Sequence, residues 1–193
     1  DYTTMRFLLQ GSGYLQKEKE KNMTHLTTTT EAQTSFYPTP DDVGKKMLEG
    51  IDLRHISTVL EPSAGKGNLI HALGKAAVGV NENLSVDAVE IDPNLRAILE
   101  HTYGGALRDS IHTQMGNIRY GSVKRGTPIT DKEQKELDQL TALSNLLDAI
   151  NEFYVVHDDF LTFDTRKRYD LILMNPPFED GDKHLMKALT LLA

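Results

Sequence analysis

The sequence predicts an α/β fold with a doubly wound, mostly parallel sheet, and two observations indicate this class. Short apolar segments typical of buried strands alternate with segments of helical apolar spacing, and parallel strands joined by helices produce that alternation. Turns containing glycine or proline separate the two kinds of segment. The 193 residues, 39% of them hydrophobic and 25% charged, fit one ordinary globular domain. We therefore expect a single folded unit.

The first 35 residues differ in composition from the rest of the chain. A short apolar stretch at 7–9 is followed by alternating lysine and glutamate at 17–21 and by four threonines at 27–30. The alternating charges are typical of a solvated helix face with ion pairs within one turn. We expect an N-terminal helix and a polar tether over 1–35, followed by the main domain over 36–193.

The main domain begins with a rigid turn and a helix. Two prolines flank Thr39 in the segment 37–40, which is the chemistry of a fixed turn. Asp41 and Asp42 are typical helix-starting residues, and the apolar residues that follow them have helical spacing. We expect this helix to cover 41–50.

Two strand and helix pairs follow. A buried strand is expected at 57–60, a glycine turn at 61–67 and a helix at 68–78. A second strand is expected at 85–90 and a second helix at 93–100. This order is that of a parallel sheet whose strands are connected by helices.

The stretch 101–152 interrupts this order, because connections between neighbouring strands are usually shorter. We interpret it as an insertion. Its first part, 101–130, has four basic residues and one acid, whereas 131–152 has six acids and two lysines. The second part is expected to be a helix with one apolar face, most simply explained by core packing, formed by Leu137, Leu140, Leu143, Leu147 and Ile150.

Strand patterns resume at 153–156 and 170–174, and a terminal helix is expected to begin near Lys183. Four strands can be placed in total.

Charge and composition exclude several classes of protein. The 21 basic and 28 acidic side chains give a formal charge of -7, so bulk electrostatics would not hold the chain to nucleic acid, and any such contact must be local. No apolar run is long enough to cross a bilayer, and the first ten residues lack the zones of a signal peptide. The absence of cysteine excludes disulfides, thiolate zinc sites and a cysteine nucleophile. We expect a cytoplasmic protein.

Ligands of open parallel sheets bind beyond the carboxyl ends of the strands, so the residues that directly follow each strand are the candidate site. The first such segment, 61–67, has no β-carbon at Gly65 or Gly67, which lets a ligand approach the backbone closely. Its spacing matches neither a phosphate-binding P-loop nor a dinucleotide-binding turn. Tight packing of the strand against the helix is an equally good interpretation of the glycines alone.

Carboxylates follow the second and third strands. Glu90 is placed to accept hydrogen bonds from the hydroxyls of a ribose, whereas Asp92, before Pro93, is better explained as a helix cap. Asp159 and Phe160 combine an acceptor with an apolar face, which an adenine ring requires.

The fourth strand is followed by Asn175-Pro176-Pro177-Phe178. Two prolines fix the backbone and remove two amide donors, so the Asn175 side-chain oxygen and the Pro176 carbonyl are both available as acceptors. An amino group matches such a pair, and Phe178 offers a flat stacking surface. An ordinary turn is the alternative interpretation of this tetrapeptide.

Taken together, these segments resemble the class I S-adenosylmethionine-dependent methyltransferases, which have a Rossmann-like fold, over about residues 36–178. The order of the segments is similar to the gamma-type arrangement of adenine-specific DNA methyltransferases, in which a cofactor-closing motif precedes the cofactor loop. The resemblance implies S-adenosylmethionine as the cofactor. Because the family's sheet continues with further strands beyond the four placed here, the sheet is expected to be incomplete at the C-terminus. Either a missing stretch or a partner chain completes it, or this is a fragment with impaired activity. The resemblance also implies that Asn175, Pro176, Pro177 and Phe178 are catalytic, and that the cofactor contacts Tyr37, Thr39, Glu61, Ser63, Ala64, Gly65, Gly67, Glu90, Ile91, Asp159 and Phe160.

We therefore expect methyl transfer to the amino group of an adenine flipped out of DNA, without a metal and without a histidine base. The histidines, His157 and His184 among them, are expected at the surface or in packing, with a place for His184 near the pocket as the alternative. Protein glutamine and rRNA guanine present the same amino chemistry, and a non-catalytic binding module keeps the same fold. The basic first part of the insertion is expected either to contact phosphates or to be a solvated loop.

Overall fold

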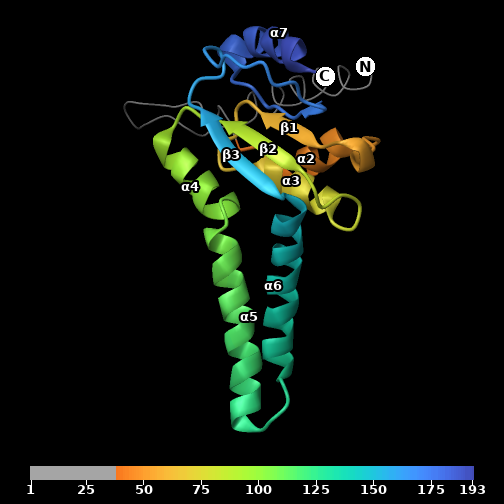
Figure 1. Cartoon of the computed structure of the whole chain (residues 1–193), viewed down its shortest axis with the longest axis vertical. Helices are drawn as coiled ribbons and strands as arrows, with labels where there is room; N and C mark the ends of the chain where they lie inside the picture. Colours follow the sequence, from red (N-terminus) through yellow and green to blue (C-terminus); the bar gives the residue numbers. More distant parts are fainter. Residues whose placement is uncertain (1–37) are drawn as a thin grey trace, which may run out of the picture.

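The computed structural model describes residues 38–193, so the helix and tether expected over 1–35 lie outside the described residues. Four strands and a set of helices cover this part of the chain (Figure 1). The strands are β1 (Thr58–Glu61), β2 (Ser85–Val89), β3 (Glu152–His157) and β4 (Leu171–Ile172). The helices are α2 (Asp41–Leu48), α3 (Asn68–Ala77), α4 (Pro93–Tyr103), α5 (Ala106–Arg125), α6 (Asp131–Ala149) and α7 (Gly181–Leu191), with short 3-10 turns η1 (Leu53–His55) and η2 (Phe178–Asp180).

The four strands form one sheet in the order β3-β2-β1-β4, and every neighbouring pair is parallel. This confirms the predicted α/β class with a parallel sheet. Strand β1 has β2 on one side and β4 on the other, so the connections leave it in opposite directions. Such a reversal leaves a crevice at the carboxyl ends of the strands, where open α/β sheets bind their ligands.

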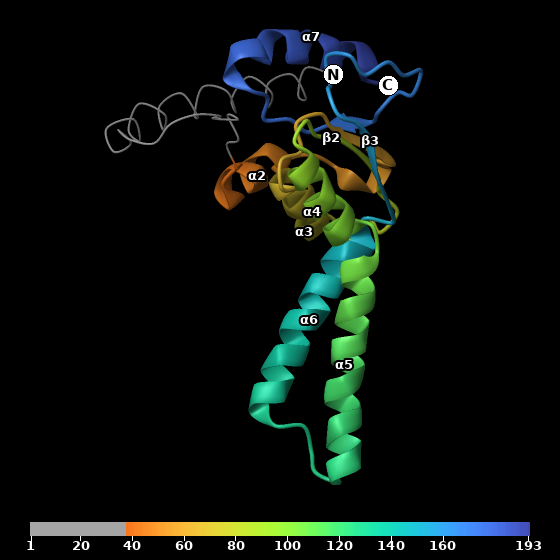
Figure 2. The same ribbon diagram turned by 90° about the vertical axis from the view of Figure 1, so that its left-hand side faces the viewer.

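Alternate residues of the strands face two separate apolar layers, because successive side chains of a strand point to opposite faces. Val59 and Val86 pack with α2, α3, α4 and the start of the insertion. Leu60 and Ile172 pack on the other face with α7 and the segment that precedes β4. Figure 2 shows α7 on one side of the sheet and α2, α3 and α4 on the other.

Strand β2 carries a buried carboxylate, Asp87, which is 4% exposed. It accepts hydrogen bonds from the hydroxyl of Tyr169 at 2.6 Å and from Nζ of Lys167 at 2.9 Å. Burial and the adjacent carboxylate raise the pKa of Tyr169. The pair of donors compensates the cost of removing a charge from water, and it fixes the chain just before β4 against the middle of the sheet.

The strand and helix boundaries differ from the predicted ones by a few residues. The fourth strand is shortened most in proportion, because it covers two residues rather than the predicted 170–174. It is held at its start by Asp170, whose carboxylate accepts bonds from the backbone N–H groups of Ser57 and Thr58 at 2.9 Å. On its outer edge, Tyr169 forms an isolated parallel bridge with Leu192.

The insertion forms an antiparallel helical hairpin of α5 and α6, which lies at the end of the molecule opposite α7 (Figures 1 and 2). The expectation of a solvated loop in its basic part is therefore wrong. The hairpin leaves after α4 and returns at the amino end of β3. Leu137, Leu147 and Ile150 are buried, which confirms the predicted apolar face of the second helix.

Local contacts hold the far end of the hairpin. Thr130 and Glu133 form a capping box at the start of α6, and Arg125 at the end of α5 pairs with Glu133 at 2.7 Å. These bonds lower the pKa of Glu133 to about 2. No helix within residues 38–193 has the length and apolar character needed to span a bilayer.

Candidate functional site

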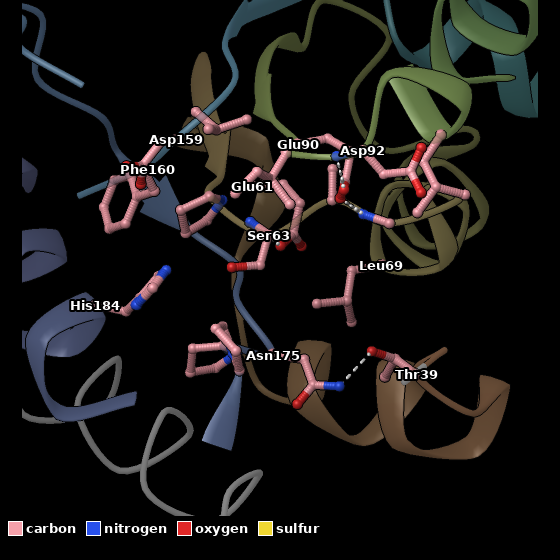
Figure 3. Close-up of a pocket in the computed structure, with 18 of the residues that line it drawn as sticks. Thr39, Glu61, Ser63, Leu69, Glu90, Asp92, Asp159, Phe160, Asn175 and His184 are labelled. Carbon is pink, nitrogen blue, oxygen red and sulfur yellow. Dashed lines mark hydrogen bonds between the residues drawn. The ribbon is translucent and has the colours of Figure 1, made fainter. Parts of the chain in front are cut away.

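A pocket of about 450 Å³ lies at the carboxyl ends of the strands (Figure 3). Its walls come from the segments that follow all four strands, from residues 38 and 39 before α2, and from the first turn of α7. The volume is typical of a small-molecule site. The crevice expected from the strand order is therefore present as a cavity.

Most of the residues singled out from the sequence line this one pocket. From the cofactor set they are Thr39, Glu61, Ser63, Ala64, Gly65, Glu90, Ile91, Asp159 and Phe160, and from the catalytic set Asn175, Pro176, Pro177 and Phe178. Tyr37 lies outside the described residues. Segments separated by more than a hundred residues in the sequence thus share one cavity.

Gly67 is an exception, because it does not belong to the pocket lining. It precedes α3 with a φ of +86°, in the left-handed region that favours glycine. A β-carbon there would lie 2.8 Å from the ring of Tyr103 and 2.9 Å from Leu99. The structure therefore explains this glycine by helix packing, the alternative interpretation of the glycine turn, and not by ligand contact.

Glu90 directly follows β2, and its carboxylate holds the backbone of two neighbouring turns. Its Oε2 accepts a hydrogen bond of 2.6 Å from the N–H of Gly65, and its Oε1 accepts one of 2.8 Å from the N–H of Asp92. Gly65 has a φ of +57°, which favours glycine at this turn. A carboxylate oxygen has two acceptor positions, so both oxygens of Glu90 retain capacity for a hydroxyl ligand.

Glu61, at the end of β1, is a buried carboxyl group whose hydrogen bonding is incomplete. It is 2% exposed, and its Oε1 accepts a bond of 3.2 Å from the N–H of Ser63. Its Oε2 is buried and has no hydrogen-bond partner among the described residues. Burial, with a smaller contribution from Glu90, raises the pKa of Glu61 well above its ordinary value. A cationic group in the pocket would provide the missing partner.

Thr39 orients the side chain of Asn175. The Nδ2 of Asn175 donates to Oγ1 of Thr39 at 3.1 Å, and Nδ2 of Asn68 donates to the carbonyl of Thr39 at 3.2 Å (Figure 3 shows the first bond). Thr39 is 6% exposed. Because Nδ2 of Asn175 faces Thr39, Oδ1 of Asn175 lies on the side of the amide away from Thr39. The turn at 37–40, expected near the cofactor, thus contacts the predicted catalytic asparagine.

The residues predicted to surround adenine differ in exposure. Ile91 is 70% exposed and lies at the rim, whereas Phe160 is 2% exposed. The ring of Phe160 already contacts the ring of His184 at 5.4 Å, and Nζ of Lys187 lies 5.4 Å from its centre. Asp159 uses Oδ1 to accept the N–H of Leu161 at 2.9 Å. Phe160 is therefore already buried between His184 and Lys187.

Asn68 and His184 are among the lining residues that the predicted site set does not include. Asn68 lines the pocket and fixes Thr39, as described above. His184 also lines the pocket and is 7% exposed, so the alternative placement near the pocket is the one observed. The sequence signal for His184 is its place in the first turn of the helix that follows Asn175–Phe178.

No family model and no curated protein matches the sequence. Among solved structures, the rRNA methyltransferase AviRa from Streptomyces viridochromogenes is similar in two structures, at 2.4 Å and 1.5 Å, each at 14% identity over 84% of this chain and 74% of that chain, with a TM-score of 0.51. An O-methyltransferase from Bacillus cereus in complex with SAH aligns at 12% identity over 100% of this chain and 62% of that chain, with a TM-score of 0.42. The likeness to AviRa shows a shared Rossmann-like fold.

Proposed function

We propose that this protein transfers a methyl group from S-adenosylmethionine to the exocyclic amino group of adenine in DNA. The observation that carries the proposal is the position of Asn175–Phe178 in the same cavity as Glu61 and Glu90. The turn alone has many explanations, and so does the pair of carboxylates. An amino-group acceptor set and a cofactor-type loop in one pocket favour group transfer between two ligands.

The pocket fits the polar groups of S-adenosylmethionine. The buried Oε2 of Glu61 lacks a partner among the described residues, and the ammonium of the cofactor's methionine part is a donor of the required charge. Glu90 retains acceptor positions for the ribose hydroxyls, and Asp159 with Phe160 supports the adenine end. The shared fold with an rRNA methyltransferase is consistent with this assignment.

The bound cofactor would supply an electrophilic methyl group on a sulfonium. The chain supplies the environment of the nucleophile. Hydrogen bonds from the two N–H groups of the amino group to Asn175 Oδ1 and the Pro176 carbonyl would localise the nitrogen lone pair and stabilise positive charge that develops there. Thr39 holds the asparagine amide in the orientation that this role requires.

Two features support adenine in DNA over other amino substrates. Phe178 lines the pocket next to the acceptors, where it can stack on a planar base flipped out of a duplex. Pro38 and Thr39 also line the pocket, in the place that the resemblance to gamma-type adenine methyltransferases gives to the closing motif. The α5–α6 hairpin lies at the opposite end from α7, so phosphate contacts near the pocket would come from other residues.

Two measurements test the proposal. Isothermal titration with S-adenosylmethionine is expected to give a single binding site. Transfer of a tritiated methyl group is then compared on adenine-containing duplex DNA, the same DNA without adenine, ribosomal RNA and a mixture of proteins. We expect labelling of the first substrate and N6-methyladenine in its digest. Absence of cofactor binding would contradict every methyltransferase interpretation, and labelling of RNA or protein alone would assign a different acceptor.

A further inference from the structure

His184 lies in the wall of the pocket and takes no part in the chemistry described so far. It is 7% exposed, in the first turn of α7, directly after Asn175–Phe178 and η2. Figure 3 shows its ring pointing from α7 into the space bounded by Phe160, Ser63 and Asn175. It is the one histidine among the residues that line this pocket in the described chain.

One hydrogen bond defines the proton state of the ring. Nδ1 of His184 lies 2.9 Å from the carbonyl oxygen of Asp180. A carbonyl oxygen can only accept, so Nδ1 carries the proton and donates it. In the neutral ring the lone pair is then on Nε2. The helix that holds His184 therefore also selects its tautomer.

The ring is held in place by packing. Phe160 contacts it with ring centres 5.4 Å apart and planes inclined by 35°. The charged residues that line the pocket are Glu61 at the end of β1, Lys66 in the turn that follows it, Glu90 and Asp92 after β2, Asp158 and Asp159 after β3, and Glu179 and Asp180 in η2, while Lys183 and Lys187 lie further along α7. Lys183 pairs with Asp180 at 2.6 Å, and Nζ of Lys187 donates to the carbonyl of Leu161. Carboxylates outnumber cations among the residues that line the pocket.

The carboxylates of the pocket are less suitable proton acceptors. Both oxygens of Glu90 accept backbone N–H bonds, and Asp159 is engaged by Leu161. Burial raises the pKa of Glu61, so its proton is held by the folded protein in the absence of a cation. His184 differs from them, because its neutral form has an oriented basic lone pair.

We propose that Nε2 of His184 accepts the proton that the substrate amino group releases on methylation. The amino nitrogen forms a bond to the methyl carbon while the carbon–sulfur bond breaks and its electron pair remains on sulfur. The nitrogen then carries one proton in excess, and this proton moves to Nε2. The imidazolium is stabilised by the nearby carboxylates and returns its proton to solvent after product release.

This inference rests on the proposed function, and the variant His184→Asn separates the two. Its amide nitrogen can replace Nδ1 as the donor to Asp180, but no base remains at the position of Nε2. We expect kcat to fall by about 100-fold or more, as for the loss of a general base, while the dissociation constant for S-adenosylmethionine changes by less than about twofold. With saturating S-adenosylmethionine, which removes the contribution of Glu61 to cofactor binding, we expect kcat/KM for DNA to fall toward acid pH in the wild type and this fall to disappear in the variant. A purely structural role would leave that pH profile unchanged.

A matched control is His112→Asn on the hairpin, where the histidine ring contacts Ser144. It is expected to have wild-type kcat and the wild-type pH profile. An active wild type whose His184→Asn variant keeps its pH profile would overturn the role of His184 alone. A wild type that binds the cofactor and methylates none of the amino substrates would overturn the proposed function, and this inference with it.

A measurement on the wild-type chain does not depend on the folding of any variant. Long-range proton–nitrogen NMR correlation at a pH where the ring is neutral distinguishes the two tautomers. We expect the His184 proton on Nδ1. A proton on Nε2 would remove the acceptor and contradict the proposal.

Discussion

The pocket and the α5–α6 hairpin are stabilised by contacts of different range. In the pocket, Thr39 bonds to Asn175 across 136 positions, and Glu90 bonds to Gly65 across 25. At the far end of the hairpin, Thr130 and Glu133 are three positions apart, and Arg125 is eight from Glu133. The polar groups are buried in the pocket and exposed in the hairpin.

The difference predicts how each region responds to substitution. A buried polar group that loses a long-range partner has no replacement in water, whereas an exposed group exchanges its partner for solvent. Substitutions in the pocket should therefore change binding and catalysis, and substitutions in the hairpin should change local stability by small amounts. Five predictions test this contrast.

The largest effect is expected for Asn175→Ala. Removal of the acceptor is expected to lower kcat by about 100- to 1000-fold, the range found for single groups that stabilise developing charge. Cofactor affinity should stay within about threefold, because the cofactor loop is on other strands. Tritium transfer and calorimetry measure the two quantities. The exposed Asn117→Ala on the hairpin serves as the control and should be active; equal loss in both variants would contradict the contrast.

Glu61→Gln should weaken cofactor binding by about 10- to 100-fold, since one charge-assisted bond contributes about 1.5–3 kcal/mol. It should also raise the free energy of unfolding of the cofactor-free protein at neutral pH. The reason is that a buried carboxyl group, which ionises freely only in the unfolded chain, is replaced by a neutral amide. Exposed Glu136→Gln on α6 is the matched control. Unchanged affinity in Glu61→Gln would exclude a cation at this position.

The same residue gives a pH dependence with a defined sign. Burial raises the pKa of Glu61 in the folded protein above its unfolded value, so the folded state binds this proton more tightly. Its contribution to stability is complete below the unfolded pKa and is lost as pH rises through the folded pKa. Cofactor affinity should rise over the same interval, because the ionised carboxylate binds the cation. Glu61→Gln should flatten both trends in calorimetric titrations.

A pair of glycines compares the packed turn that precedes α3, beside the pocket, with the exposed hairpin by stability alone. Gly67→Ala is expected to lower the free energy of unfolding by about 2–3 kcal/mol, from left-handed strain and contact with Tyr103. Gly116→Ala, in the exposed part of α5 with open space around it, is expected to raise it by about 0.5–1 kcal/mol. Urea denaturation measures both. Opposite signs support the contrast, and similar values would refute it.

A small effect, confined to stability, is expected for Thr130→Ala at the start of α6. Loss of the capping box should cost about 1 kcal/mol of stability. Cofactor affinity and kcat should be unchanged, because the hairpin lies at the opposite end of the molecule from α7. A change in cofactor affinity in this variant would indicate that the hairpin is coupled to the pocket.

The sequence by itself determined the class of fold and the order of the strand-end segments. Period-two and helical spacing are local properties, and a parallel sheet brings all carboxyl strand ends to one edge, so Glu61, Glu90, Asp159 and Asn175 could be assigned to one pocket. The apolar face of α6 was predictable for the same reason, since it depends on neighbours within two turns.

The tertiary structure alone decided what each of these groups contacts. The packing of Gly67 against Tyr103 and the bond from Asn175 to Thr39 join positions that no local pattern relates. The direction of the hairpin and the placement of His184 depend equally on how layers pack on the two faces of the sheet. Burial and long-range hydrogen bonds arise from the folded arrangement, and they set the proton state of Glu61 and the orientation of the acceptors.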